Sequence, residues 1–173
     1  LGLYTLVMEF CPGGDLLDRI RRARERADAT HEGPFVPPDG ADRWIGQIFL
    51  GLEHMHLRMQ TLLRDLKPDN VVLSADGCAK LTDFGFGRFG IESSGCWSFS
   101  IPTGSPGYVA PEVLLQQSYD DRADLYSFGV LVWVLLTGGV THCATPIPPI
   151  GGGGRQRRIE DHLNDYKLLH QCL

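Results

Sequence analysis

The sequence predicts an α+β fold that is mainly helical, with a short strand near the start and a small β-hairpin. Two helical signals support this: apolar residues recur at helical spacing from Trp44 to Met55, and residues 124–136 are apolar almost all round. The hairpin signal is a pair of β-like runs, 71–73 and 79–82, separated by Ser-Ala-Asp-Gly. With 173 residues, 43% of them hydrophobic, the chain suffices for one domain or a large piece of a bigger one.

The first part of the chain predicts a strand followed by a helix. Residues 5–11 are an apolar run closed by Pro12 and two glycines, which favours a buried strand and a turn. Asp15 then occupies an N-cap position before a helix over 16–27, whose start is apolar and whose remainder is strongly basic. We expect the basic run at 21–26 to be mainly a solvated helix face, with contact to an acidic partner as the alternative.

The next helix follows a loop rich in proline and glycine over 31–40. Asp39 or Asp42 can cap this helix, and its apolar periodicity extends to about His56.

The later part of the chain has one long loop and one strongly apolar helix. The stretch from Gly85 to Gly107 lacks periodicity, which predicts a long surface loop. The apolar helix over 124–136 is expected in the middle of a domain. A Gly- and Pro-rich linker follows over 144–154. We therefore expect a folded unit over 1–140 and a linker with a partial continuation over 141–173.

Composition excludes several classes of protein. A net charge of −5 argues against bulk electrostatic binding of nucleic acid. The longest apolar run, 130–136, is far shorter than the roughly 20 residues of a spanning helix, so no transmembrane segment is expected. The five cysteines are scattered without a CxxC pair, which favours free thiols and a cytoplasmic (cytosolic or nuclear) location.

The chemistry-bearing residues gather around the predicted hairpin. Asp65, Lys67 and Asn70 precede its first strand, and Asp83 follows its second. The hairpin would bring Asn70 and Asp83 side by side, where two oxygen ligands suit a hard divalent cation that carries phosphate. Lys67 can neutralise a transferring phosphoryl group while Asp65 orients a hydroxyl.

Three motifs resemble the eukaryotic-type protein kinase family in order and separation. They are LRDLKPDN at 63–70, DFG at 83–85 and APE at 110–112, and the resemblance covers about 3–138. Lys67 and GSPGYVAPE, 104–112, are similar to the serine/threonine subclass. The resemblance implies the mainly helical C-terminal lobe with the hinge strand and a small β-hairpin, with the N-terminal lobe largely absent. The 1–140 unit is then a partial catalytic domain within a longer kinase.

The resemblance implies catalytic and metal-binding roles. Asp65 would accept the proton of the substrate hydroxyl or orient it, and Lys67 would contact the γ-phosphate of ATP. Asn70 and Asp83 would hold Mg²⁺. Asp124 would brace residues 63–70, the catalytic loop of the family, from the buried helix.

The resemblance also implies an ATP pocket along the first strand. Met8 would be the gatekeeper, and the Glu9 carbonyl and Cys11 amide would bond the adenine. The remaining members of the expected ATP-binding set are Asp15 near the ribose, Val72 under the adenine, and Thr82.

The loop before the APE motif would be the activation segment. Its candidate functional hydroxyls are Ser98, Ser100, Thr103 and Ser105. Ser105 replaces the usual Thr that bonds the catalytic Asp and Lys, and Arg64 could pair with a phosphate on one of the others. Leu63 departs from the usual His or Tyr, a change that we expect to tune activity.

These features predict an ATP- and Mg²⁺-dependent serine/threonine protein kinase acting on protein substrates. Acidic Asp15 and Asp69 favour substrates with basic residues before the acceptor. The alternatives are a pseudokinase-like or truncated non-catalytic binding module, and a small-molecule phosphotransferase of related fold. The isolated chain is expected to have weak activity or none.

Overall fold

The computed structural model describes residues 5–30, 35–89 and 103–139 and confirms a mainly helical α+β fold. The helices are α1 (Leu16–Thr30), α2 (Ala41–Leu57), α3 (Pro111–Leu114) and α4 (Arg122–Thr137), with 3-10 turns η1 (Pro68–Asn70) and η2 (Phe84–Phe86). Four short strands form two antiparallel pairs, β1 (Thr61–Leu62) with β4 (Arg88–Phe89), and β2 (Val71–Leu73) with β3 (Ala79–Leu81). None of the helices in these ranges is long and apolar enough to cross a membrane.

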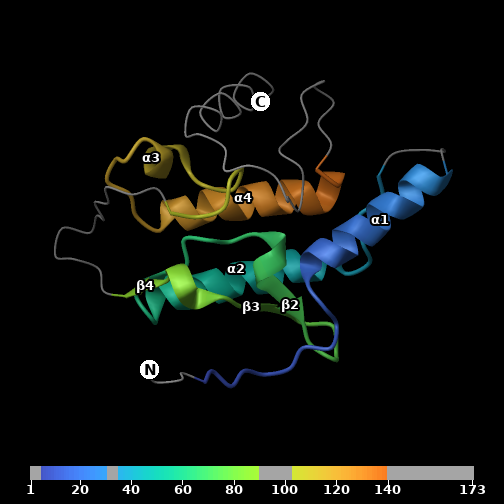
Figure 1. The fold of residues 1–173 in the computed structure, drawn as a ribbon, viewed down its shortest axis with the longest axis horizontal. Coiled ribbons are helices and arrows are strands. Elements are labelled where there is room, and N and C mark those ends of the chain that lie inside the picture. The colour runs from blue at the N-terminus through green and yellow to red at the C-terminus, as the bar shows by residue number, and fades with distance from the viewer. Residues whose placement is uncertain (1–4, 31–34, 90–102, 140–173) are drawn as a thin grey trace.

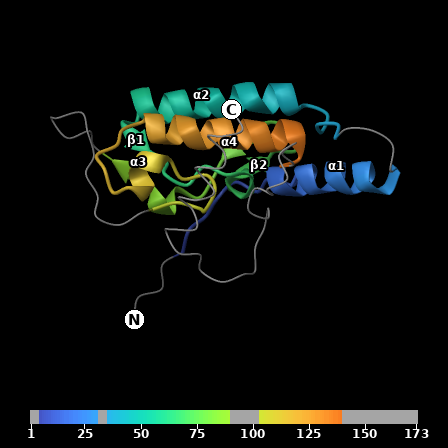
Figure 2. The same ribbon diagram turned by 90° about the horizontal axis from the view of Figure 1, so that it is seen from above.

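The core lies where α2 and α4 run side by side (Figures 1 and 2). The rings of Phe49 and Phe128 lie 5.7 Å apart between these helices. The core residues that the two helices share are Trp44, Ile48, Leu52, Met55, Leu131, Val134 and Leu135. Helical periodicity predicted α2, because its spacing places the apolar residues on a common face, and α4 was predicted from residues that are apolar almost all round.

The predicted apolar helix is α4, but it is not covered on all sides by the described residues. Leu131 and Val134 are fully buried, whereas Leu125 is 41% exposed and Leu136 44% exposed. Covering a helix all round requires neighbours on every side, and the described neighbours of α4, which are α2, the catalytic loop and the segment around α3, leave part of it exposed.

The β2–β3 hairpin forms with the predicted turn. Val71 pairs with Leu81, and the Gly77 amide donates to the Ser74 carbonyl at 2.9 Å. On α2, the Gln47 side chain accepts a hydrogen bond from the Ala79 amide at 2.8 Å, which fastens the hairpin to the helix.

The predicted cap of α1 is confirmed. The Asp15 carboxylate accepts a hydrogen bond from the Asp18 amide at 2.8 Å and satisfies one free amide of the first turn. Leu16 and Ile20 are buried, and Arg24 donates to the Gly138 carbonyl at 2.8 Å, which joins α1 to the end of α4.

The predicted cap of α2 is wrong. Gly40 occupies the N-cap with φ of 90°, and no side chain bonds the first turn there. A backbone solution replaces the expected Asp39 or Asp42 cap, because glycine adopts this left-handed conformation without a steric penalty.

The strand expected over residues 5–11 does not form. Leu6, Val7 and Phe10 are 82%, 89% and 84% exposed, and the segment has no ladder partner in the described ranges. A strand needs a neighbouring strand to satisfy its backbone groups, so an apolar run alone does not make one. In the described ranges the segment is held by the contact of Glu9 with Lys80 and, just past its end, by the Gly13 amide, which donates to the Leu73 carbonyl at 2.9 Å.

Candidate active site

The catalytic-loop residues form one hydrogen-bonded cluster. The Lys67 Nζ lies 2.9 Å from the Asp65 Oδ2, and the Asn70 Nδ2 donates to the Asp65 backbone carbonyl at 2.9 Å and to its Oδ2 at 3.1 Å. Asp65 is 3% exposed, and its second oxygen, Oδ1, is buried without a hydrogen-bond partner among the described residues. A buried carboxylate oxygen without a donor is costly, which suits an atom reserved for a ligand proton.

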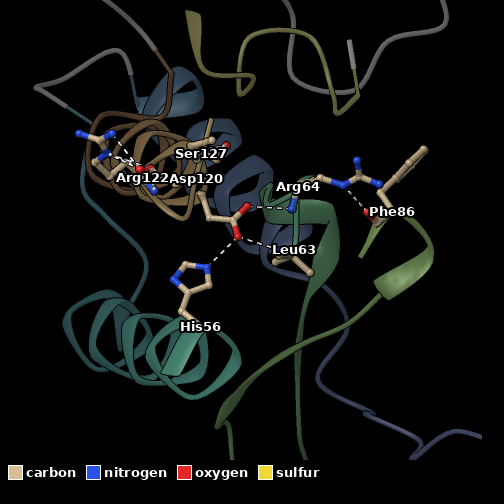
Figure 3. A network of polar contacts seen from close by, with 9 residues as sticks. His56, Leu63, Arg64, Phe86, Asp120, Arg122 and Ser127 are labelled. Atoms are coloured by element: carbon tan, nitrogen blue, oxygen red, sulfur yellow. Dashed lines mark hydrogen bonds and ion pairs between the residues drawn. The ribbon is translucent and has the colours of Figure 1, made fainter. Parts of the chain in front are cut away.

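Asp124 holds the backbone of this loop, as expected. Its Oδ2 accepts from the Leu63 amide at 2.8 Å and its Oδ1 from the Arg64 amide at 2.7 Å. His56 on α2 points to the same carboxylate, with Nε2 2.8 Å from Oδ2 (Figure 3). The Asp124 side chain is fully buried on α4, so its carboxylate joins α4, α2 and the catalytic loop.

Arg64 carries the strained point of the loop. Its φ is 67°, a left-handed value that is uncommon for residues other than glycine. Its Nε donates to the Phe86 carbonyl at 2.6 Å (Figure 3). The two Asp124 hydrogen bonds offset a conformational cost of about 1–3 kcal/mol, and Arg64 thereby links the loop to the segment after DFG.

Asp83 follows the second strand of the hairpin. Its backbone runs close to the catalytic-loop cluster, but its side chain makes no hydrogen bond to the residues of that cluster. It is exposed, has φ of 58°, and accepts from the Gly85 amide at 3.3 Å. The preceding Thr82 amide donates to the Asn70 carbonyl at 3.0 Å. The hairpin therefore brings the chain at Asn70 and the chain at Asp83 together, as the sequence predicted.

Ser105 joins the cluster from the activation segment. Its Oγ accepts a hydrogen bond from the Lys67 Nζ at 2.6 Å. Gly104, with φ of 118°, makes this approach possible, because a Cβ there would lie 2.7 Å from the Arg64 carbonyl oxygen. Ser105 thus replaces the expected threonine toward Lys67, while no bond to Asp65 is found.

The donor set fits a hard cation that is held partly by phosphate. Both Asn70 amide hydrogens face Asp65, which leaves the amide oxygen Oδ1 for a metal. Asp83 uses Oδ1 on Gly85 and retains Oδ2. In the described ranges no three His, Cys, Asp or Glu residues gather as a complete metal site. Mg²⁺ is commonly held by one or two carboxylates together with substrate phosphates, so this set fits it.

The expected ATP-pocket residues are only partly gathered. Asp15 and Val72 form a backbone bridge, and Thr82 lies at the end of the same hairpin. Met8 is 61% exposed, and the Glu9 carboxylate bonds Lys80 on β3 at 2.6 and 2.7 Å. This contact raises the pKa of Lys80 above its usual value.

The other members of this set make local contacts around the turn before α1. Cys11 is half-buried at the turn, where its carbonyl accepts from the Gly14 amide at 3.4 Å. The Asp15 carboxylate is engaged as the cap of α1.

The candidate phosphorylation sites are divided by the limits of the described ranges. Ser98 and Ser100 lie outside the described residues. Thr103 lines a small cavity of about 10 Å³ together with Arg64 and Asp124, about the space of one water molecule.

Two residues of this site were not predicted from the sequence. His56 had no predicted role in the site, and its contact with Asp124 joins positions 68 residues apart. The signal was a histidine on the inner side of a helix, which by itself does not identify a partner. Gly104 could have been found from its position directly before Ser105 in the activation segment.

Comparison with known proteins assigns the whole region to one family. A family model described as "Protein kinase domain" matches residues 2–146. The mouse "Hormonally up-regulated neu tumor-associated kinase" is 36% identical over 143 residues, 83% of this chain and 18% of that protein. The rice (Oryza sativa subsp. japonica) "CBL-interacting protein kinase 30" is 39% identical over 133 residues, 76% of this chain and 26% of that protein. The mouse "Serine/threonine-protein kinase Nek3" is 37% identical over 134 residues, 78% and 24% of the two chains. The chain therefore spans less than a third of the length of these relatives.

Proposed function

Because the chain belongs to the protein kinase family, we propose that it carries the catalytic loop of an enzyme that transfers the γ-phosphate of ATP to Ser or Thr hydroxyls of proteins. The observation that carries this proposal is the buried Asp65 Oδ1, which lacks a hydrogen-bond partner in the described ranges. The other oxygen of the same carboxylate is occupied by Lys67 and Asn70. One oxygen is thus fixed and the other is available to accept the proton of a substrate hydroxyl.

Lys67 supplies positive charge beside this oxygen. Its Nζ touches both Asp65 and the Ser105 hydroxyl, and its side chain is 23% exposed, so it reaches the surface where a phosphate would lie. A positioned ammonium stabilises the charge that develops on a transferring phosphoryl group. Asn70 and Asp83 would hold Mg²⁺, which supplies further neutralisation of the phosphates when bound.

The serine/threonine class is supported by the Lys67–Ser105 contact and by the relatives. Lys67 in this place is similar to the serine/threonine subclass, and one relative is named a serine/threonine-protein kinase. The same contact connects the catalytic loop to the segment that precedes APE. This segment would then present the acceptor peptide to Asp65.

The test is phosphate transfer from Mg-ATP to a serine peptide by the natural protein that contains this chain. Asp65→Asn should lower kcat by about 10²–10⁴-fold, since it removes the proton acceptor and keeps the shape. Asp42→Asn is the control, because it removes the same charge from an exposed residue of α2, and it should leave kcat unchanged. Equal rates for Asp65→Asn and the unchanged protein would contradict the proposal.

A non-catalytic binding module is the second candidate. The exposed apolar residues Leu6, Val7 and Phe10 favour it, because they offer a surface for another chain. Binding of Mg-ATP without any phosphate transfer to protein would support this candidate over the first.

We also propose that the acceptor peptide carries basic residues before the acceptor. Asp69 is exposed next to Asn70, and Asp15 precedes α1 and forms a backbone bridge with Val72. Carboxylates near a peptide-binding site favour arginine or lysine in the bound peptide. A peptide library should show enrichment of Arg or Lys before the acceptor, and Asp69→Asn should reduce it. A library without such enrichment would contradict this substrate preference and leave the catalytic proposal intact.

A further inference from the structure

The basic run of α1 divides into arginines with different surroundings. Arg21 lies 3.9 Å from Asp18, and Arg24 donates to the Gly138 carbonyl at the end of α4. The other three arginines, Arg19, Arg22 and Arg26, follow the spacing i, i+3, i+7 and therefore share one face of the helix. We call these three the arginine stripe. One nitrogen of Arg19, Nη2, also donates to the Gly13 carbonyl at 2.9 Å.

The arginine stripe borders a cavity of about 220 Å³. The opposite walls are Pro38 and Asp39 before α2, Trp44 on α2, and Leu73 and Gly77 of the β2–β3 hairpin. None of Asp65, Lys67, Asn70 or Asp83 lines it. The cavity is therefore separate from the candidate active site.

The walls of this cavity are firmly built. Trp44 is 5% exposed, and its Nε1 donates to the Gly77 carbonyl at 2.9 Å. The same carbonyl accepts from the Arg43 Nη2 at 2.7 Å, which brings a further guanidinium to the rim. The hydrogen bond holds the Trp44 indole against the β2–β3 hairpin, so the apolar wall is formed before any ligand binds. A preformed wall lowers the entropic cost of binding.

The charge around the cavity has the opposite sign to the chain as a whole. The chain carries a net charge of −5, yet the lining holds the three arginines of the stripe against Asp39, the one acidic residue among the described lining residues. Like charges three and four residues apart on a helix repel one another. An anionic ligand would remove this repulsion and bond the guanidinium groups, which suit carboxylates in particular.

We propose that this surface binds an acidic peptide segment of a partner protein. At about 220 Å³ the cavity is smaller than the roughly 300–1,000 Å³ of sites that enclose a small-molecule ligand, so it suits one apolar side chain of a peptide. Trp44 and Leu73 form the wall against which that side chain packs. Carboxylates on either side of it in the peptide bond the arginine stripe.

This interaction does not depend on the proposed phosphate transfer, because the two sites share no residue. We expect the acidic peptide to bind the arginine stripe equally well when Asp65 is replaced by Asn. The experiment below therefore distinguishes failure of this proposal from failure of the catalytic one.

The test is fluorescence anisotropy of a fluorescein-labelled peptide of alternating Glu and Leu, titrated with the full chain. Arg22 is exposed, so Arg22→Glu should preserve the fold, which circular dichroism checks. It should weaken binding at least about tenfold, since one close charge pair becomes repulsive. The matched control, Arg21→Glu, makes the same change of charge at a residue that does not line the cavity. It should alter the affinity by no more than about twofold, because its spacing places Arg21 on a different face of α1 from the arginine stripe.

Four results would overturn the proposal. They are an absence of peptide binding, an equal loss in Arg22→Glu and Arg21→Glu, equal binding of a peptide of alternating Lys and Leu, and binding of phosphatidylserine vesicles in place of the peptide. If Arg22→Glu disturbs the fold, Arg22→Gln replaces it and should weaken peptide binding in the same direction, again with Arg21→Gln unchanged.

Discussion

A single carboxylate organises the residues around the catalytic loop. Asp124 accepts hydrogen bonds from the Leu63 and Arg64 amides and lies against His56. Leu63, which stands in place of the usual His or Tyr of the motif, is itself fully buried in the core. The catalytic loop is therefore held by the Asp124 carboxylate and by the apolar packing of Leu63. These contacts keep Asp65 at the edge of the core.

Replacing Asp124 by Asn should destabilise the protein. The side-chain NH2 group of the new Asn would face backbone N–H groups, which are donors as well. Buried hydrogen bonds would therefore be lost, at a cost of about 3 kcal/mol. Urea denaturation measures this change. Asp121→Asn is the control, since Asp121 is exposed at the N-cap of α4 and its side chain makes no cap bond. We expect it to change stability by no more than about 0.5 kcal/mol. Similar losses in both variants would contradict this role.

The hairpin turn contains a second, independent residue-scale test. The Ser74 hydroxyl, and to a smaller extent Cys78, donates to the Asp76 carboxylate and lowers its pKa from 3.8 to about 2. Because the pKa of the folded state is depressed, Asp76 stabilises the fold above about pH 4. This contribution is lost as the pH falls toward about 2.

Ser74→Ala should raise the pKa of Asp76 back toward 3.8, as measured by a carboxyl NMR titration. Cys78→Ala should produce a smaller rise, since its contact is the lesser cause. A larger rise in Cys78→Ala than in Ser74→Ala would contradict the order of these two contacts.

At the scale of elements, the turn at Gly13 and Gly14 packs closely against β2 of the hairpin. The Gly13 amide donates to the Leu73 carbonyl, and the Leu73 amide donates to the Gly14 carbonyl at 2.8 Å. A Cβ on Gly13 would lie 2.6 Å from both the Cβ and the carbonyl oxygen of Leu73. Only glycine allows this contact, which precedes α1 and joins it to β2.

Gly13→Ala should therefore destabilise the protein by about 1–3 kcal/mol, because β2 must shift or the two hydrogen bonds must lengthen. Gly46→Ala is the matched control on α2, where an added Cβ meets no atom within 4 Å. It should stabilise the helix by about 0.5–1 kcal/mol, since alanine is the better helix former. Thermal unfolding of both variants gives the sign, and a neutral Gly13→Ala would show that the approach is not tight in solution.

At the scale of the whole molecule, one apolar segment lies on the surface beside a well-packed core. Leu6, Val7 and Phe10 are each more than four-fifths exposed, while the core between α2 and α4 is fully buried. Consecutive exposed apolar side chains promote association with another chain. The position of this segment beside β3, held by the Glu9–Lys80 contact, makes it the surface most prone to association in the described part of the chain.

Replacing Leu6 and Phe10 together by Lys should reduce self-association of the full chain, measured by analytical ultracentrifugation, without changing its unfolding temperature. Val36→Lys is the control, because Val36 is also 70% exposed but stands outside the segment. An equal reduction in the control would mean that charge in general, and not this segment, limits association.

The site was predictable from the sequence to the extent that its contacts are local. Lys67 and Asn70 reach Asp65 across two and five positions of one loop, and the hairpin turn places Thr82 on Asn70. The contacts of His56 with Asp124 and of Ser105 with Lys67 span 68 and 38 positions. Only the second of these could be expected, because the family motif implies it.

What the sequence by itself determined is the set of elements whose cause lies within a few residues. They are the Asp15 cap, the periodic face of α2, the apolar run of α4, the turn at Gly77 and the order of the catalytic loop. Tertiary structure decided the features that need a partner from elsewhere in the chain. The apolar run at 5–11 has no neighbouring strand in the described part of the chain, and the arginine stripe borders a cavity only because α2 and the hairpin supply the opposite walls. The physical reason is that backbone pairing and burial are properties of two surfaces, and a local pattern specifies only one of them.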